Sequence, residues 1–388
     1  MKILLVSVAP LRKELGASKV IIEVAEELER LGWQCTLVSV PDLLERSPAI
    51  DAGDPLGSAK ALRAYLQAHA AEYDVVDYPL GYLPFPRGEF PARTLFVGRS
   101  VLLIHHFSEI ELRTYPSLKA RAHALVYGRR LRAEHRETVA RADATIAGAD
   151  LVNVSNDDDL AILRRHGVPE EKIAVLPYGL SREAAASFER APRPEAPPPT
   201  AAPTVAFVGT FDSRKGAADF PTLARRIVAG VPEARFLLLG TYRGEAEVRS
   251  RFPRALRSRL TVIPHYSTDK LPELLSGSSI GVFPSYIEGF GFGVLEMLAA
   301  GLPVIAYAAP GPPMMLPPRY LAPIGDARGM GDKVVELLKD APALAAAGAW
   351  ARERSRAFHW DAIGRATSEV YLERLERQRR QTPPPASG

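Results

Sequence analysis

The sequence predicts an α/β protein with two halves, each containing a doubly wound parallel sheet. Short apolar runs of strand length alternate with amphipathic segments of helical period along most of the 388 residues. This alternation is interrupted once, at residues 181–204, by a stretch with six prolines and few large apolar side chains, and then restarts. The length is sufficient for two or three domains of about 150 residues, each with its own core.

The first half opens with a strand–helix–strand unit. Residues 3–8 form a continuous apolar run, typical of a strand covered on both faces. Apolar side chains then recur at helical spacing over residues 20–31, Gly32 ends that helix, and residues 35–40 form a second strand. Further short strands are predicted at residues 75–76, 101–104, 145–146, 151–154 and 173–175, with a helix rich in Arg and His at about residues 117–142.

The second half repeats the pattern after the proline-rich stretch. Its strands are predicted at residues 205–208, 236–239, 260–263, 280–283 and 304–307, with helices between them. We therefore expect a first domain at residues 1–180, a linker at 181–204 and a second domain at 205–357. A closing amphipathic helix at 358–378, packing back on the first domain, and a disordered tail at 379–388 would follow.

The composition excludes several classes of protein. With 47% hydrophobic and 24% charged residues, the chain is neither fibrous nor largely disordered. Its single cysteine, Cys35, excludes a disulfide scaffold and a thiolate zinc site. A net charge of +4 is too small to indicate nucleic-acid binding, and we expect no nucleic-acid partner.

Two features bear on location in the cell. No apolar run reaches the 18 residues of a membrane span, and the amino terminus lacks the layout of a signal peptide, so we expect a cytoplasmic protein. Five arginines, however, make the helix at 117–142 basic. A solvated charged face explains them most simply, and peripheral docking on anionic lipid at the inner face of the membrane is the alternative. They are Arg121, Arg129, Arg130, Arg132 and Arg136.

The segment 283–306, FPSYIEGFGFGVLEMLAAGLPVIA, is the most informative stretch of the chain. A strand ends near Phe283, and a glycine-rich turn leads into a helix that Gly301 and Pro303 terminate. Glu296 lies off the apolar face of that helix, where a carboxylate could accept two hydrogen bonds from a ribose diol. Glu288 lies in the turn, and the amides around it would face anionic groups. In isolation, both glutamates would be solvated surface charges.

This segment resembles the signature of the family-four retaining glycosyltransferases, P-S-x-x-E-G-F-G-x-x-x-x-E-x-x-x-x-G-x-P-V. The matching residues are Pro284, Ser285, Glu288, Gly289, Phe290, Gly291, Glu296, Gly301, Pro303 and Val304. The resemblance extends to VAFVGTFDSRKG at 205–216, where Arg214 and Lys215 match the cationic pair that holds the donor diphosphate in that family. The chain departs from the family at Thr210, which follows Gly209 where an arginine is usual.

The resemblance also covers candidates in the first half. Gly16, Ala17 and Ser18 match a turn usually made by two glycines, which would let a phosphate or an acceptor approach the backbone. The predicted strand at 101–104 ends in His105, which matches a histidine near the donor sugar, and His106 is the reserve. In the closing helix, Trp360 would be a packing residue.

The family resemblance implies two Rossmann-like domains facing a cleft, the GT-B fold, and transfer of a sugar from a nucleotide-diphosphate donor to an unidentified acceptor with retention of configuration. It implies no cofactor and no required metal, and the sequence also lacks metal-ligand spacing on any one helix face. The catalytic candidates are Glu288, His105, Arg214 and Lys215. The donor-binding candidates are Gly209, Arg214, Lys215, Gly289, Phe290, Gly291, Phe292 and Glu296.

Two other kinds of function remain open at this level. A relative of the same fold, such as a sugar-nucleotide epimerase or a phosphorylase, would use a similar donor site. A nucleotide-sugar-binding protein without turnover would do so as well, and Ala17 and Thr210 are the substitutions that raise this alternative. Donor hydrolysis, however slow, would separate an enzyme from a binding protein.

Overall fold

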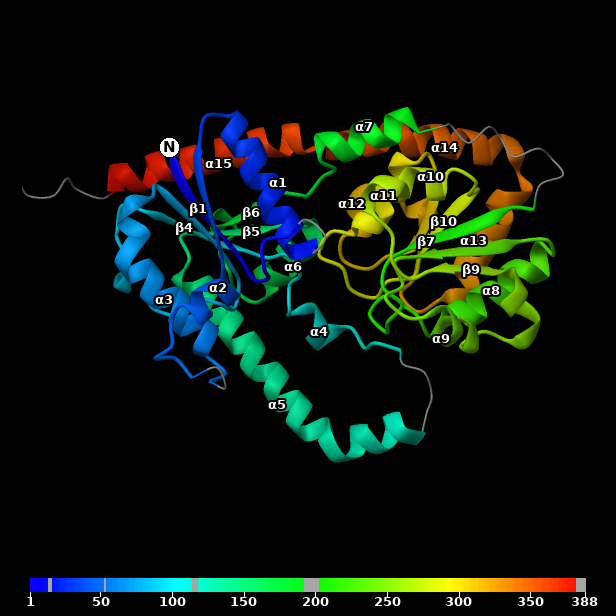
Figure 1. Ribbon diagram of the computed structural model, residues 1–388, viewed down its shortest axis with the longest axis horizontal. Helices are drawn as coiled ribbons and strands as arrows, with labels where there is room; N and C mark the ends of the chain where they lie inside the picture. The colour runs from blue at the N-terminus through cyan, green and yellow to red at the C-terminus, as the bar shows by residue number, and fades with distance from the viewer. Residues whose placement is uncertain (13–15, 52–53, 114–117, 192–201, 382–388) are drawn as a thin grey trace, which may run out of the picture. The chain divides into compact units, whose positions relative to one another are not determined.

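In the computed structural model, residues 1–12, 16–51, 54–113, 118–191 and 202–381 are described (Figure 1). The chain divides into two compact units. The first unit comprises Met1–His105, His123–Tyr178 and Trp360–Gly388. The second comprises His106–Ala122 and Gly179–His359. The division differs from the expected boundaries because residues 106–122, from the first half of the sequence, belong to the second unit.

The described residues of the first unit contain a six-stranded parallel sheet in the order β2-β1-β3-β4-β5-β6. β1 pairs with β2 from Lys2 opposite Gln34 to Ser7 opposite Ser39. The apolar run in β1 is fully buried, as predicted for a strand covered on both faces. The strands are β1 Lys2–Ser7, β2 Gln34–Ser39, β3 Val75–Pro79, β4 Leu95–Arg99, β5 Leu151–Val154 and β6 Ile173–Val175.

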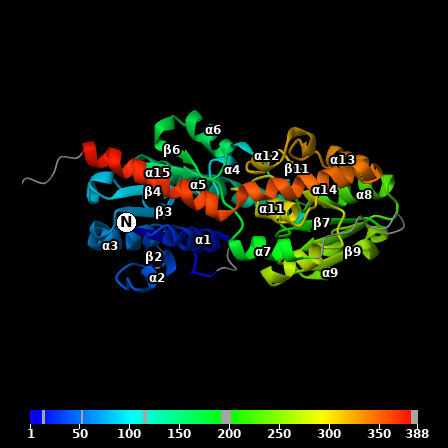
Figure 2. The ribbon, with the colours of Figure 1, turned by 90° about the horizontal axis from the view of Figure 1, so that it is seen from above.

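The carboxy-terminal helix α15 packs beside α1 in the first unit (Figures 1 and 2). Trp360, at the start of α15, is 1% exposed, and its indole Nε1–H donates to Glu23 of α1 at 2.6 Å. Trp33 donates in the same way to Ser368 at 2.9 Å. The helices are α1 Gly16–Arg30, α2 Val40–Glu45, α3 Gly57–His69, α5 Leu118–Gly148, α6 Asp157–Arg165 and α15 Trp360–Gln381.

The described residues of the second unit also contain a six-stranded parallel sheet, in the order β12-β11-β10-β7-β8-β9. The first strand of this unit, β7, lies beside β10, so the strand order reverses between them. In open α/β sheets such a reversal marks the position where ligands bind. The strands are β7 Thr204–Val208, β8 Arg235–Leu239, β9 Leu260–Ile263, β10 Ile280–Phe283, β11 Val304–Tyr307 and β12 Leu321–Ala322.

Helices cover both faces of the second sheet. α8 lies beside α13, and α11 lies beside α14 (Figure 2). Ser181 and Asp340 cap α7 and α14 by accepting a hydrogen bond from an amide of the first turn. The helices are α4 His106–Glu109, α7 Arg182–Arg190, α8 Phe220–Gly230, α9 Glu245–Ser250, α10 Leu271–Leu275, α11 Phe292–Ala299, α12 Pro312–Met315, α13 Ala327–Lys339 and α14 Ala341–Ser355.

Two predicted strands are wrong. Residues 101–104 are not a strand; the strand is β4, six residues earlier, whose sequence LFVGR ends in a glycine and a charge. At Gly98 a Cβ atom would lie 2.7 Å from Leu80 Cδ2, so a larger residue there would require the end of the Leu80 side chain to move. Arg99 is tolerated because it pairs with buried Asp77, at 2.6 Å from Nη2 to Oδ2. The predicted strand at 145–146 lies inside α5, where the Thr145 hydroxyl donates to the carbonyl of Arg141.

The predicted linker also differs in part. Residues 182–190 form α7, because its alanines and paired charges favour a helix once Ser181 caps it. Residues 192–201 lie outside the described residues, as do residues 382–388. The expected tail began at residue 379, but residues 379–381 still belong to α15, because the first proline that stops the helix comes only at residue 383. Within the part of the chain that the structure describes, no helix has both the length and the apolar character needed to cross a bilayer.

Candidate functional site

The loops after β7 and β10 form the candidate site, at the carboxyl ends of the two strands where the order of the second sheet reverses. The loops are joined by main-chain contacts. The amide of Tyr286 donates to the carbonyl of Arg214 at 2.8 Å, and the Ser285 hydroxyl donates to the same carbonyl at 3.1 Å. Gly216, at φ +72°, lies so close to Pro284 that a Cβ atom would collide with its carbonyl oxygen. Only glycine fits this approach.

Glu288 lies at the centre of the two loops. Its side chain is 7% exposed, and its Oε1 atom lies 2.7 Å from Lys215 Nζ and 3.2 Å from Arg214 Nη1. The Ser285 hydroxyl donates to the same oxygen. These hydrogen bonds and ion pairs of the carboxylate are made by its Oε1 atom. A carboxylate has lone pairs on both oxygens with which to accept hydrogen bonds.

The two cations carry one more charge than Glu288 neutralises. Lys215 is 12% exposed, and its ammonium lies 4.8 Å from the centroid of the Phe283 ring, a cation–π distance. Arg214 is 29% exposed, and it also donates to the carbonyl of Ile287 at 3.2 Å. The fold thus holds both cations in place, and the two loops together carry a net positive charge. That arrangement suits an anionic group such as a diphosphate.

Thr210 occupies the position where the family resemblance leads one to expect an arginine, but it does not supply the positive charge of that arginine. Its hydroxyl donates to Asp212 Oδ2 at 2.6 Å, and the other oxygen of Asp212 accepts from the amide of Lys215 at 3.1 Å. Thr210 therefore shapes the loop that presents Lys215, without adding a charge. The preceding residue, Gly209, has φ +150° and bonds through its amide to the carbonyl of Leu239.

Helix α11 starts beside these loops. Gly291 precedes it with φ +98°, and Gly293 lies so close to the carbonyl of Val208 that a side chain there would collide with β7. Gly289 and Phe290 are buried, and the Phe290 and Phe292 rings lie 5.3 Å apart. The structure thus gathers the predicted donor-binding residues of the second half around one edge of the sheet.

Glu296 is half-buried on α11, off the fully buried face of the helix. It lies near Tyr266, whose pKa is raised by burial and, to a lesser degree, by the negative charge of Glu296. Tyr266 belongs to the loop after β9, and its ring lies against Gly240, which has φ +70°. Tyr266 is a candidate site residue that the sequence analysis missed, because no motif surrounds it.

A second missed residue is Tyr242, in the loop after β8. It has φ +50°, the one positive φ outside glycine among the described residues, and it is 61% exposed. Its ring packs edge-on against His265 at 4.7 Å. A bulky residue in this conformation is strained by about 1–3 kcal/mol, and such strain concentrates at functional sites. An exposed aromatic ring at the carboxyl edge of the sheet can stack with a planar group.

Asp219 is hydrogen-bonded to the loop that contains Glu288. It is fully buried and accepts from the hydroxyls of Tyr286 at 2.7 Å and Tyr307 at 2.8 Å. Arg113, from the segment that the first half contributes to this unit, donates to the other Asp219 oxygen at 2.7 Å. Asp219 thereby connects Arg113 to the loop that contains Glu288.

His105, the catalytic candidate in the first unit, is placed differently from the prediction. It does not end a strand, since β4 ends at Arg99, and its side chain is fully buried. Its Nε2 atom lies 2.8 Å from Asp143 Oδ1 of α5, and its ring packs edge-on against His166 at 4.9 Å. The strand predicted to end at His105 is therefore wrong, and a role for His105 beside a donor sugar stays a prediction. The reserve, His106, is buried at the start of α4.

Residues 16–18 begin α1. The buried Ser18 hydroxyl donates to the carbonyl of Pro10 at 2.7 Å and lies 3.1 Å from the Ser7 hydroxyl, so it fastens the loop after β1 to the helix. Gly16 and Ala17 start the helix after residues 13–15, which lie outside the described residues. Their predicted role as an acceptor or phosphate loop stays a prediction.

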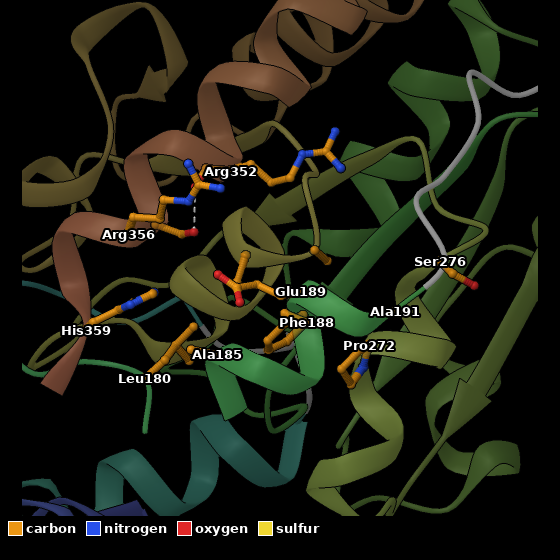
Figure 3. A pocket seen from close by; sticks show the side chains of 13 residues that line it. Leu180, Ala185, Phe188, Glu189, Ala191, Pro272, Ser276, Arg352, Arg356 and His359 are labelled. Atoms are coloured by element: carbon orange, nitrogen blue, oxygen red, sulfur yellow. Dashed lines mark hydrogen bonds between the residues drawn. The ribbon is translucent and has the colours of Figure 1, made fainter. Parts of the chain in front are cut away.

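A cavity of about 360 Å³ lies elsewhere in the second unit, between α7, α10, the end of α11 and α14 (Figure 3). Figure 3 shows Glu189 and Phe188 on its α7 side and Arg352 and Arg356 on its α14 side. None of the predicted site residues lines it. The cavity is therefore separate from the loops around Glu288.

Comparison with known proteins relates the second unit to one family. Residues 202–340 match the family described as "Glycosyl transferases group 1", as the resemblance predicted. The D-inositol 3-phosphate glycosyltransferase of Mycolicibacterium smegmatis is 29% identical over 199 residues, or 49% of this chain. That match spans only 44% of the length of the relative. A protein of the same name from Mycobacterium bovis is 29% identical over 174 residues, covering 43% of this chain and 35% of its own.

Solved structures extend the likeness to the whole chain. Sucrose-phosphate synthase from Thermosynechococcus elongatus matches with a TM-score of 0.70 and 21% identity, covering 96% of this chain and 98% of its own. Anabaena HepE in complex with UDP-glucose matches with a TM-score of 0.66 and 18% identity, covering 96% and 100%. The predicted fold class is confirmed: two Rossmann-like domains of the GT-B type.

Proposed function

Because the second half of the chain carries a group 1 glycosyltransferase domain, we propose that the protein is a retaining glycosyltransferase with a nucleotide-diphosphate sugar as its donor. The observation that supports this most directly is the cluster of Lys215, Arg214 and Glu288 at the strand-order reversal of the second sheet. It combines a net positive charge for a diphosphate with a carboxylate oxygen available to a sugar hydroxyl.

In the proposed reaction, the bond between the anomeric carbon and the diphosphate oxygen breaks, and its electron pair leaves with the diphosphate. The acceptor hydroxyl forms the new bond on the same face of the sugar and gives its proton to the departing diphosphate. Negative charge grows on the leaving oxygen, so the fixed cations Lys215 and Arg214 stabilise the transition state more than the ground state. They supply this charge without a metal ion.

The remaining donor groups are assigned by position. Glu288 would orient the sugar through its second carboxylate oxygen. Glu296 would accept hydrogen bonds from the ribose, and the exposed ring of Tyr242 would stack on the base. We assign no catalytic role to His105, because its imidazole is buried against Asp143 and His166.

The test is a panel of UDP-, GDP- and ADP-sugars, first by thermal shift and then by release of the nucleoside diphosphate. We expect one donor to raise the melting temperature and to turn over when acceptors are added, inositol 3-phosphate among them because a relative is named for it. Turnover should persist in excess EDTA. Glu288→Gln should abolish it while Glu273→Gln, an exposed glutamate of α10 in the same unit, should not.

Other outcomes separate the rival functions. Binding of a donor without any hydrolysis or transfer would support a nucleotide-sugar-binding protein. Formation of an epimeric sugar nucleotide, or phosphate-dependent cleavage of a glycoside, would support an epimerase or a phosphorylase. A product of inverted configuration would contradict the retaining reaction.

We also propose peripheral contact with anionic membranes through α5. The side chains of Arg129, Arg130, Arg132 and Arg136 are exposed, and Leu131 among them is 48% exposed. Basic residues around an exposed apolar side chain favour an anionic lipid surface. Flotation with phosphatidylserine vesicles, compared with neutral vesicles, tests this; equal recovery on both would contradict it. The side chain of Arg121 is not described in the structure, so the proposal does not use it.

A further inference from the structure

Three potential metal ligands from separate parts of the sequence meet in the first unit. They are His105 in the loop after β4, Asp143 near the end of α5, and His166, the residue that caps the end of α6. One ligand atom from each residue lies within 4.8 Å of the ligand atoms of the other two. All three belong to the first unit, whereas Glu288, Arg214 and Lys215 belong to the second.

Among the described residues, the imidazole of His105 makes its hydrogen bond to a member of this cluster. Its side chain is 0% exposed, and its Nε2 atom lies 2.8 Å from Asp143 Oδ1. Its Nδ1 atom is buried and, among the described residues, has no hydrogen-bond partner. The His166 ring stands nearly perpendicular to it, at 80°. The buried His105 side chain therefore faces the exposed carboxylate of Asp143 and the exposed imidazole of His166.

We propose that these residues bind a divalent transition-metal ion of the zinc class. Two imidazoles and one carboxylate form a set that suits Zn²⁺ and its neighbours in the first transition row, whereas Mg²⁺ and Ca²⁺ prefer oxygen ligands alone. Ligand atoms that share a tetrahedral zinc lie about 3.4 Å apart, given bonds of about 2.0–2.2 Å. The distance of 2.8 Å between His105 Nε2 and Asp143 Oδ1 is shorter than this value, and Asp143 and His166 can rotate to adjust it because both are exposed.

Such an ion would join three elements that the sequence separates. His105 is the last residue of the first unit before the chain enters the second. The chain returns to the first unit at His123, within α5. An ion bound by His105 and Asp143 would link the loop after β4 to α5, and His166 would link the same ion to the end of α6. The three protein ligands leave a position for water, which is common at half-exposed zinc sites.

The experiment is zinc binding to the full-length protein without an affinity tag. The protein is stripped with a chelator and then titrated with Zn²⁺ in competition with a chromophoric chelator. We expect one equivalent of zinc to bind and the melting temperature to rise. His166→Ala and Asp143→Asn should each weaken zinc binding by about tenfold or more and remove the thermal shift. Co²⁺ in place of Zn²⁺ should give visible absorption that His166→Ala reduces.

The matched control is His69→Ala. His69 is an exposed histidine of the same unit that pairs with a carboxylate, Glu72, at 2.8 Å, and no third ligand from the described residues joins that pair. Its loss should leave zinc binding unchanged. We avoid His105→Ala because removing a fully buried side chain can unfold the unit. The proposal is overturned if no zinc binds, if both cluster variants keep wild-type affinity, or if His69→Ala weakens binding equally.

Discussion

Replacing Lys215 by methionine should separate the charge of the candidate donor site from its shape. Methionine keeps the length and most of the apolar contact of lysine, so the packing against Phe283 is largely retained. The change removes an ammonium that is 12% exposed and lies 2.7 Å from Glu288. Arg214 and Ser285 still contact the carboxylate, so Glu288 keeps two partners.

Two magnitudes follow from these contacts. A charge-assisted contact to a diphosphate contributes about 1.5–3 kcal/mol, which corresponds to an increase of about 10- to 150-fold in Kd. Removing one partner of a buried ion pair costs about 3–5 kcal/mol of stability when nothing replaces it. Because Glu288 keeps Arg214 and the Ser285 hydroxyl, we expect a smaller loss, about 1–2 kcal/mol.

Calorimetry with the nucleoside diphosphate that the donor panel selects measures the first quantity, and thermal unfolding reports the second. Lys270→Met is the matched control, since it makes the same change at a lysine of the same unit that is 63% exposed and 3.7 Å from Glu273. It should alter neither quantity measurably. If the folded Lys215→Met protein binds the diphosphate as tightly as the wild type, Lys215 does not contact it, and the assignment of the site is wrong.

Three further predictions concern other parts of the chain. Glu296→Gln should raise the Kd for the nucleotide about tenfold with little change in melting temperature, because the side chain lies off the buried face of α11; a collapse in melting temperature at unchanged affinity would make it structural. Tyr242→Gly should weaken nucleotide binding in calorimetry yet raise the melting temperature, since glycine adopts φ +50° without strain; a lower melting temperature would show that the ring packs for stability. Burial, aided by Glu29, raises the pKa of Cys35 from an ordinary 9.0 to about 12, so iodoacetamide should modify the folded protein slowly at pH 8. Fast alkylation of the native protein at pH 8 would contradict the burial of the thiol. The same pKa shift stabilises the folded state below pH 9, and this contribution to the free energy of unfolding is lost as the pH rises toward 12.

The second half of the fold was predictable because its signals are local. The strands predicted at residues 260–263, 280–283 and 304–307 coincide with β9, β10 and β11, since each is a short apolar run followed by a turn. The cluster around Glu288 was predictable for the same reason, because its residues occupy two short motifs. These motifs lie at the ends of neighbouring strands, so the fold brings them together.

The first half was harder to predict because its decisive contacts are distant in sequence. β4 was missed since Arg99 looks like a loop charge until Asp77 and Tyr371 of α15 surround it. Tyr242 carries no motif, and only its backbone conformation marks it. The cluster of His105, Asp143 and His166 has no characteristic spacing, so a search along the sequence for metal ligands could not find it.

The path of the chain limits how the protein can be cut. The polypeptide passes between the two units four times, at residues 105/106, 122/123, 178/179 and 359/360. A fragment that starts after Tyr178 would lack Arg113, and Asp219, in contact with Tyr286 of the donor loop, would lose its charged partner. A fragment that ends there would lack α15 and the tyrosine that completes the Arg99–Asp77 pair. Neither half is an independent module, so domain exchange with a relative must transfer the segment 106–122 and α15 together with the units they join.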